Sequence, residues 1–297
     1  MLSGMEAGAQ DGGGPIRALR GHFADRWELS VRYGIVVGAP FAAGVSGHAS
    51  PLGAIAASAA LLILLLGPPG YGIARRAQVL GAAVLLGVAA GVGALVQNHE
   101  WAVVLCRLGV GAFFAFARNV DRAMATVALF PLVGLLIGTG APDGPRSAVE
   151  LLGAAVIGGG LFLLLLDRVW PSPEHPSVAI EGRAHRSLPA LILALPVGYV
   201  LASLVVDWHM AAYAFALLAI PVILNARKAG RTTRHELLGF LVILALVAIE
   251  VRIPVRPDVM VFTAIAVAIV GAWRAERGTV PLWSTLGTVL VLVGSVS

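Results

Sequence analysis

Charged residues are scarce in this chain. Only 12% of its 297 residues are Asp, Glu, Lys or Arg, whereas a soluble domain carries roughly 25%. Hydrophobic residues make up 58% of the chain, and the mean hydropathy is +0.89. A single water-soluble core cannot bury so many apolar segments. The composition therefore excludes a soluble domain and predicts a polytopic membrane protein.

Residue types that build catalytic and metal sites are few and scattered. The single cysteine, Cys106, lies inside an apolar run, which excludes an internal disulfide and a CxxC metal site. The histidines occur singly, and the sequence has no HExxH, Walker or Ser/His/Asp arrangement. Asp121 stands without the second acidic cluster that membrane prenyltransferases carry. We therefore expect no enzyme activity, no cofactor and no metal ion.

Apolar segments follow one another along most of the chain. They cover 33–47, 50–67, 77–97, 101–117, 123–139, 148–166, 187–206, 208–225, 236–251, 259–273 and 279–296. A helix needs roughly 20 residues to cross ~30 Å of hydrocarbon, and several of these segments are shorter than that. The predicted fold class is all-α, a polytopic transmembrane helical bundle of about eleven spans. Residues 1–30 are expected to form a cytoplasmic tail, with an interfacial helix from about residue 16.

The basic residues predict the orientation in the membrane. The net charge is +5, and the basic residues lie between apolar runs, which is typical of membrane topology and not of nucleic-acid binding. An N-terminus in the cytoplasm assigns seventeen of the 21 Lys and Arg residues to the inside. Only Arg146, Arg252 and Arg256 fall outside, and Arg107 lies within a span. We therefore expect a cytoplasmic N-terminus and a C-terminus on the outer side of a bacterial inner membrane.

Two stretches of the sequence resemble each other. Residues 67–81 and 225–239 each lead from an apolar run through a basic cluster to Leu-Gly, with Arg76 and Arg234 158 positions apart. Turns that read Arg, acid, Arg begin at Arg118 and Arg274, at an offset of 156. Since six spans separate the two units, they enter the membrane from the same side. The prediction is two parallel five-helix repeats, at 31–140 and 187–297, joined by a linker transmembrane helix (141–167) and a cytoplasmic loop (168–186).

Arginines are the candidate substrate-binding residues. Topology alone would place them in inner turns, which is the structural interpretation. The functional interpretation is that turns from two repeats gather positive potential at one cytoplasmic mouth and concentrate organic anions. The residues proposed for this mouth are Arg76, Arg118, Arg234 and Arg274. Arg107 lies roughly 9 Å below the outer end of its helix, where it either extends to the headgroups or faces the bundle interior as an anion-attracting group.

Several of these patterns together resemble a known family. They are Leu52-Gly53-Ala54-Ile55, the run from Pro69 to Arg76 that leads to Leu80-Gly81, Asp167-Arg168-Val169-Trp170-Pro171, Trp208 and the run from Arg234 to Gly239. The chain resembles the fusaric acid resistance and aromatic acid exporter family over most of residues 30–296. This resemblance implies an inner-membrane efflux protein for hydrophobic or aromatic organic acids that works with a periplasmic adaptor subunit.

The leading hypothesis is thus an exporter of small organic anions embedded in a lipid bilayer. Arg76, Arg118, Arg234 and Arg274 would attract the anion, and Arg107 would receive it within the membrane. A drug/metabolite-type carrier with inverted repeats is one alternative, and a non-transporting scaffold or assembly subunit is another. The sequence leaves open whether the protein forms a homo-oligomer.

Overall fold

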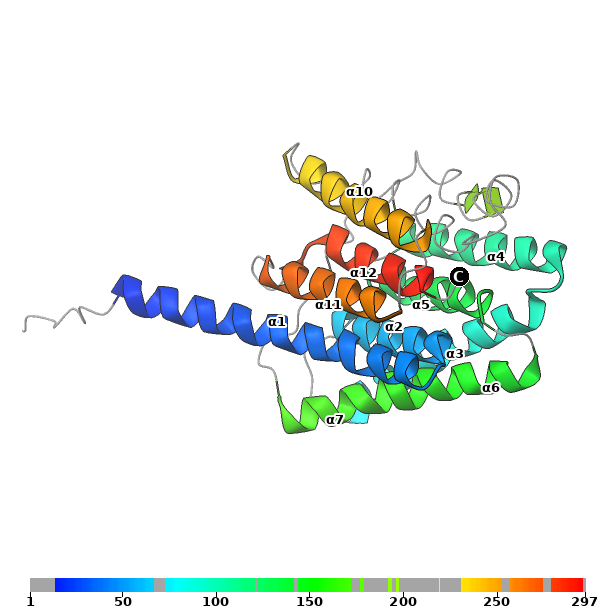
Figure 1. Cartoon of the computed structure of the whole chain (residues 1–297), viewed down its shortest axis with the longest axis horizontal. Helices are drawn as coiled ribbons and strands as arrows, with labels where there is room; N and C mark the ends of the chain where they lie inside the picture. The colour runs from blue at the N-terminus through cyan, green and yellow to red at the C-terminus, as the bar shows by residue number, and fades with distance from the viewer. Residues whose placement is uncertain are drawn as a thin grey trace, which may run out of the picture.

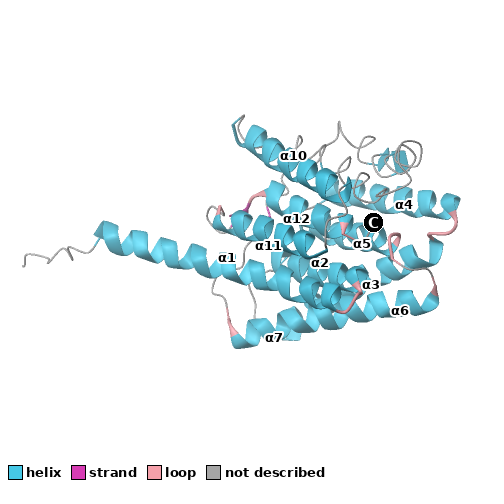
Figure 2. Cartoon of the chain, viewed as in Figure 1, coloured by secondary structure: helices cyan, strands magenta, loops and turns pink. Residues whose placement is uncertain are grey.

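Helices dominate the described part of the chain (Figure 2). The structure is a computed structural model, and it describes residues 14–66, 73–120, 122–141, 144–171, 177–178, 192–193, 196–197, 219, 231–252, 257–274 and 279–295. The first half holds α1 (Gly14–Ser46), α2 (Ser50–Leu66), α3 (Ile73–Val96), α4 (Glu100–Val120) and α5 (Arg122–Gly138). The sixth helical run comprises α6 (Pro145–Gly153), the π-helix η1 (Ala154–Leu161) and α7 (Phe162–Val169). The second half holds α10 (Arg231–Arg252), α11 (Pro257–Trp273) and α12 (Leu282–Gly294).

These helices confirm the helical fold class and nine of the predicted apolar segments. The predicted segments 187–206 and 208–225 lie almost entirely outside the described residues. One small feature departs from the all-α prediction, because β1 (Ser177–Val178) and β2 (Thr279–Val280) form a parallel pair. The pair joins the connection after α7 to the connection before α12, and sequence periodicity cannot predict strands of two residues.

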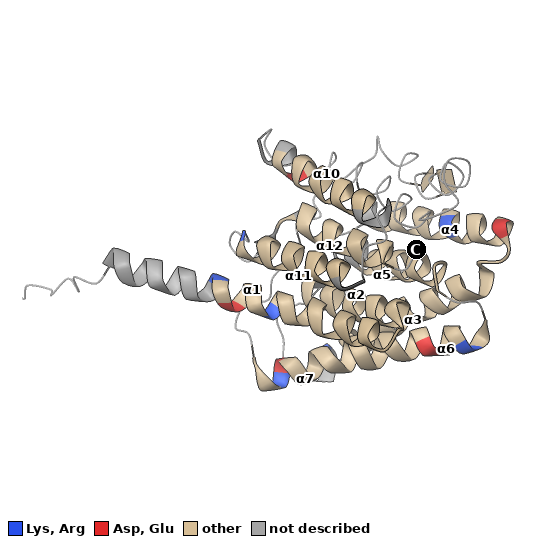
Figure 3. Ribbon diagram, viewed as in Figure 1, with Lys and Arg blue, Asp and Glu red and all other residues tan. Residues whose placement is uncertain are grey.

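Four helical runs are long and apolar enough to cross a membrane. They are Arg26–Ser46, Arg75–Val96, Glu100–Ala117 and Pro145–Val169. Shorter apolar helices of 10–17 residues accompany them, and most charged residues of the described region lie toward helix ends (Figure 3). Large apolar side chains are exposed along these helices, as is expected where the neighbour is lipid. The architecture is that of a multi-pass membrane protein.

The first helix, α1, is longer than a membrane span. Its 33 residues correspond to about 50 Å at 1.5 Å per residue. The N-terminal part of α1 extends beyond the other helices (Figure 1). The helix expected from residue 16 and the first predicted span are therefore one continuous helix.

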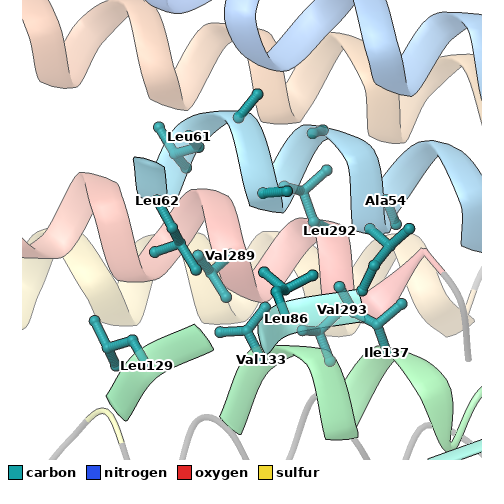
Figure 4. Close-up of a cluster of buried hydrophobic side chains, with 14 of the residues drawn as sticks. Ala54, Leu61, Leu62, Leu86, Leu129, Val133, Ile137, Val289, Leu292 and Val293 are labelled. Carbon is teal, nitrogen blue, oxygen red and sulfur yellow. The ribbon is translucent and has the colours of Figure 1, made fainter. Parts of the chain in front are cut away.

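The core lies around α2. Residues 54–65 of this helix are each no more than 4% exposed, and a helix that is apolar on every face is expected to be surrounded by other helices. Figure 4 shows its side chains Ala54, Leu61 and Leu62 in one cluster with side chains of α3, α5 and α12. The C-terminal helix thus packs into the first half of the chain.

Glycines bring α3 close to helices on two of its faces. A Cβ atom at Gly134 or Gly138 of α5 would overlap the backbone carbonyl of Leu86 or Ala90 of α3, respectively. On another face, Gly87 of α3 lies against Leu152 of α6. Such contacts between small residues are the usual way in which membrane helices approach each other. Gly87 and Gly91, one turn apart on α3, thus both lie against α6.

The π-helix η1 packs against α2 by the same principle. A Cβ atom at Gly158 would lie 2.8 Å from the Cβ of Ala56, and one at Gly159 would lie 2.9 Å from the carbonyl oxygen of Ala56. Gly160 faces Ala83 of α3. These glycines therefore bring the sixth helical run close to both α2 and α3.

Contacts also define which helix ends lie together. Gly34 and Gly38 of α1 face Ile269 and Ile265 of α11, in that order, so α1 and α11 run antiparallel. The last turn of α11 therefore lies near Arg32, at the end of the bundle that we call the Arg32 end.

The start of α10 lies at the Arg32 end as well. Gly271, near the end of α11, abuts Ser284, near the start of α12. The backbone N–H of Trp283 donates a hydrogen bond to Glu236 Oε2 of α10 at 2.7 Å. The starts of α10 and α12 and the end of α11 thus meet at one end of the bundle.

Candidate functional site

A carboxylate near the C-terminal end of α7 connects three helices at the Arg32 end. Asp167 Oδ1 accepts a short hydrogen bond from Arg32 Nη2 of α1, and its Oδ2 lies 3.1 Å from Arg75 Nη2 of α3. The side chains of Arg32 and Arg75 are only 1% and 8% exposed, and that of Asp167 is 16% exposed. Buried guanidinium groups need such partners, because an uncompensated buried charge is costly.

A second set of hydrogen bonds attaches the end of α7 to α1. Arg32 Nη1 donates to the backbone oxygen of Trp170 at 2.5 Å, and Trp170 Nε1 donates to Glu28 Oε1 at 2.9 Å. The carbonyl groups at a helix C-terminus lack intrahelical partners and attract cations. Arg32 therefore binds both the carboxylate and the terminal backbone of the same helix.

A cavity of about 540 Å³ lies beside this cluster. Three leucines, Leu161, Leu164 and Leu165, form its apolar wall. Its polar wall is lined by Arg75, Arg76, Asp167 and Arg168. The cavity is therefore bounded by apolar side chains on one part and by arginines on another.

The charge of this wall is positive. Three arginines and one aspartate line the cavity, and the carboxylate of Asp167 is shared between Arg32 and Arg75. Arg76 and Arg168 are exposed. Guanidinium groups match the planar geometry of carboxylates and phosphates and bind them through paired hydrogen bonds. The site can therefore bind an anionic group next to an apolar one.

The predicted inner-mouth arginines have different positions in the structure. Arg76 lines the cavity. Arg274 is exposed, directly after α11, and so lies at the same end of the bundle. Arg118 and Arg234 belong to the last turn of α4 and the first turn of α10, but their side chains are outside the described part of the chain. Of the predicted set, the cavity includes Arg76 alone among the side chains that the structure describes.

Arg107 lies on α4 and is not among the residues that line the cavity. Its side chain is 1% exposed, and its Nη2 donates a hydrogen bond to Thr139 Oγ1 at 3.0 Å. Thr139 follows the last residue of α5. The guanidinium is therefore held inside the bundle, near the end opposite to the Arg32 end.

Sequence reasoning missed the residues that organise the cavity. Arg32, Arg75, Asp167 and Arg168 were not among the candidates, although Asp167 is an acid at a predicted cytoplasmic helix end where arginines otherwise dominate. An acidic residue among arginines was thus the feature of the sequence that could have pointed to Asp167. Its arginine partners lie 135 and 92 positions away, and local spacing cannot connect positions so distant.

Two further contacts involve charged residues outside the cavity. Arg146 and Glu150 form an exposed pair at 2.8 Å, four positions apart on α6, and Glu236 receives the N–H of Trp283. Within the described ranges, no group of three or more His, Cys, Asp or Glu side chains is placed to hold a metal ion.

Comparisons of the chain with known protein families, with curated proteins and with solved structures give no match. The resemblance to aromatic acid exporters is thus a prediction from the sequence patterns.

Proposed function

We propose that this chain is a multi-pass membrane transporter that exports hydrophobic or aromatic organic anions, and that the cavity at the Arg32 end is its inner binding site. The observation that carries the proposal is the meeting of arginines and leucines around one cavity of about 540 Å³. This volume is typical of small-molecule sites, which span roughly 300–1,000 Å³.

The chemistry of the wall supports an organic anion in particular. Arg76 and Arg168 are exposed and available to a carboxylate, while Leu161, Leu164 and Leu165 offer an apolar surface for its hydrocarbon or aromatic part. A fully hydrated inorganic ion would gain nothing from the leucines. The site therefore favours anions that carry an apolar body.

Helix directions support the eleven-span arrangement. The sixth helical run ends at the Arg32 end, where Asp167 contacts Arg32, and α10 begins at this same end, beside Trp283. A chain that leaves and returns to one side of a membrane crosses it an even number of times between the two points. The two apolar segments predicted at 187–206 and 208–225 meet this requirement.

The packing of the two halves supports parallel repeats. In the first half α3 and α4 both pack against α5, and in the second half α10 and α11 both pack against α12. Gly239 and Gly287 show that α10 runs parallel to α12, as Gly134 and Gly138 show that α3 runs parallel to α5. An inverted repeat would separate the starts of α3 and α10 onto opposite ends of the bundle. The carrier with inverted repeats is therefore the less favoured alternative.

Export measurements test the proposed site. In cells loaded with an aromatic carboxylate, the double variant Arg76→Ala/Arg168→Ala is expected to export about ten-fold more slowly than wild type or slower still, because two charge-assisted contacts are lost. The matched control is Arg146→Ala, which removes an exposed arginine at the opposite end and should leave export unchanged. Wild-type export by the double variant, at equal expression, would remove the cavity from the path.

Arg107 belongs to the same experiment as a separate arm. Its position inside the bundle at the opposite end fits a second contact for the anion along the path, so Arg107→Ala is expected to slow export. Unchanged export at normal expression would exclude Arg107 from the path and leave the inner site unaffected.

A further inference from the structure

The arginine cavity continues into two exposed apolar stripes. On the sixth helical run, Ile157, Leu161, Leu165 and Val169 recur every four residues and are 41–83% exposed. On α3, the exposed residues Val84, Leu85, Val88, Val92 and Leu95 form a stripe of their own. These two helical runs are neighbours, because Gly160 of η1 lies against Ala83 of α3. The apolar wall of the cavity is thus part of a larger surface of lipid-facing type.

The charged part of the cavity lies at one end of this surface. Arg75 and Arg76 stand in the first turn of α3, and Asp167 and Arg168 stand in the last turn of α7. Leu165 and Leu161 lie about one and two helical turns, respectively, from Arg168 toward the middle of the bundle. An amphiphile matches this arrangement, because its anionic head would lie at the arginines and its long hydrocarbon chain along the leucines.

We propose that the cavity takes the anionic head of a membrane-embedded amphiphile, such as an anionic phospholipid, whose hydrocarbon chain lies along Leu161 and Leu165 and which reaches the site sideways from the leaflet. The amphiphile would be a substrate class of the proposed exporter. Its transport rests on that proposed function, whereas its binding to the cavity can be measured independently. Basic pockets between membrane helices on the cytoplasmic side are known to hold anionic headgroups.

Asp167 shapes the head-binding part of the site. Its carboxylate is bound to Arg32 and Arg75, so the exposed Arg76 and Arg168 are the guanidinium groups open to an arriving head. A phosphate or a carboxylate would satisfy the same two groups. The long chain separates this ligand from a soluble organic anion, because only a long chain extends past the leucines of the cavity wall to Ile157, which is 65% exposed.

Binding to the purified full-length protein tests the proposal. Dioleoyl phosphatidylglycerol, dioleoyl phosphatidylcholine and dihexanoyl phosphatidylglycerol are titrated in detergent, and bound lipid is counted by native mass spectrometry. Wild type is expected to bind the long-chain anionic lipid at least about ten-fold more tightly than either of the others, because only that lipid combines the charge with the chain. Equal affinity for the two dioleoyl lipids would overturn the charged half of the proposal. Equal affinity for the two phosphatidylglycerols would show that the long chain does not contribute to binding. The proposal of a lipid ligand would then be overturned in favour of a soluble phosphate or carboxylate.

Two matched pairs of variants locate the site. Arg76→Ala/Arg168→Ala should weaken phosphatidylglycerol binding about ten-fold, whereas Arg146→Ala should not change it. Leu165→Ser should weaken binding several-fold, whereas Val149→Ser, a 69% exposed position near the other end of the same helical run, should not. All five positions changed in these variants are exposed, so folding is expected to survive each substitution. Equal effects of target and control variants would mean that the lipid binds elsewhere.

The result is separable from the proposed function. Arginine-dependent export of aromatic carboxylates without lipid binding would overturn this inference and keep the exporter. Lipid binding at the site without export would keep the inference and overturn the exporter.

Discussion

Asp167→Ala is expected to lower the free energy of unfolding by about 3–5 kcal/mol. The substitution leaves the buried guanidinium of Arg32 with only the Trp170 carbonyl among its described hydrogen-bond partners, and it removes one partner from Arg75. It also releases the end of α7 from α3. Denaturant unfolding of the purified protein in detergent measures the change.

The control removes a carboxylate from an exposed pair. Glu150→Ala separates Arg146 from its partner on the surface of α6, and exposed pairs contribute little to stability. The double variant Arg32→Leu/Asp167→Ala should recover part of the loss, because no buried guanidinium then remains at position 32. Equal unfolding free energies for Asp167→Ala and Glu150→Ala would show that the cluster does not hold these helices together.

Gly138→Ala is expected to cost about 2–3 kcal/mol of unfolding free energy, at the upper end of the usual cost of overpacking. A Cβ atom at this position would overlap the Ala90 carbonyl of α3, and a backbone group cannot rotate aside as a side chain can. Two helices that run parallel over their length would have to separate. The measurement is thermal or denaturant unfolding in detergent.

Gly109→Ala is the matched control for this change. Gly109 also lies inside an apolar helix, but a Cβ atom there would have no neighbour within 4 Å. Alanine is the better helix former, so this variant should be as stable as wild type or slightly more so. A loss at Gly109 as large as that at Gly138 would contradict the packing explanation.

Much of the helical fold could be predicted from hydropathy alone. The segment expected at 50–67 is α2 (Ser50–Leu66), and the segment expected at 236–251 lies within α10 (Arg231–Arg252). Apolar runs bounded by charged or turn-forming residues predict such helices, because every backbone polar group of a membrane span has to be satisfied within the helix. Helix ends were less predictable: α1 continues far before the expected start at residue 33.

The identity of helix neighbours could not be predicted in the same way. The spacing of Gly134 and Gly138 in α5 is typical of a helix-packing face, yet nothing local indicates that this face meets Leu86 and Ala90 of α3. The same limit applies to the site. Positive-inside reasoning puts Arg75 and Asp167 on one side, but their contact depends on the packing of α3 against η1, which only the folded structure contains.

The π-helix is a further feature without a clear sequence signal. Residues Ala154–Leu161 are small or aliphatic and would also suit an ordinary α-helix. The close approach of Gly158 and Gly159 to α2 accompanies this altered winding. Its last residue, Leu161, is one of the leucines of the cavity wall, which links helix packing to the shape of the site.

We place the arginine cavity and the other basic turns at one end of the bundle, and we expect this end to face the cytoplasm. Single cysteines at positions 76, 168, 234, 274 and 146, in a Cys106→Ser background, are treated in intact cells with a membrane-impermeant maleimide. We predict labelling at position 146 alone, with the other four positions labelled only after the membrane is permeabilised. Labelling of position 76 or 234 in intact cells would contradict the shared cytoplasmic end, and with it the parallel repeat and the inner binding site.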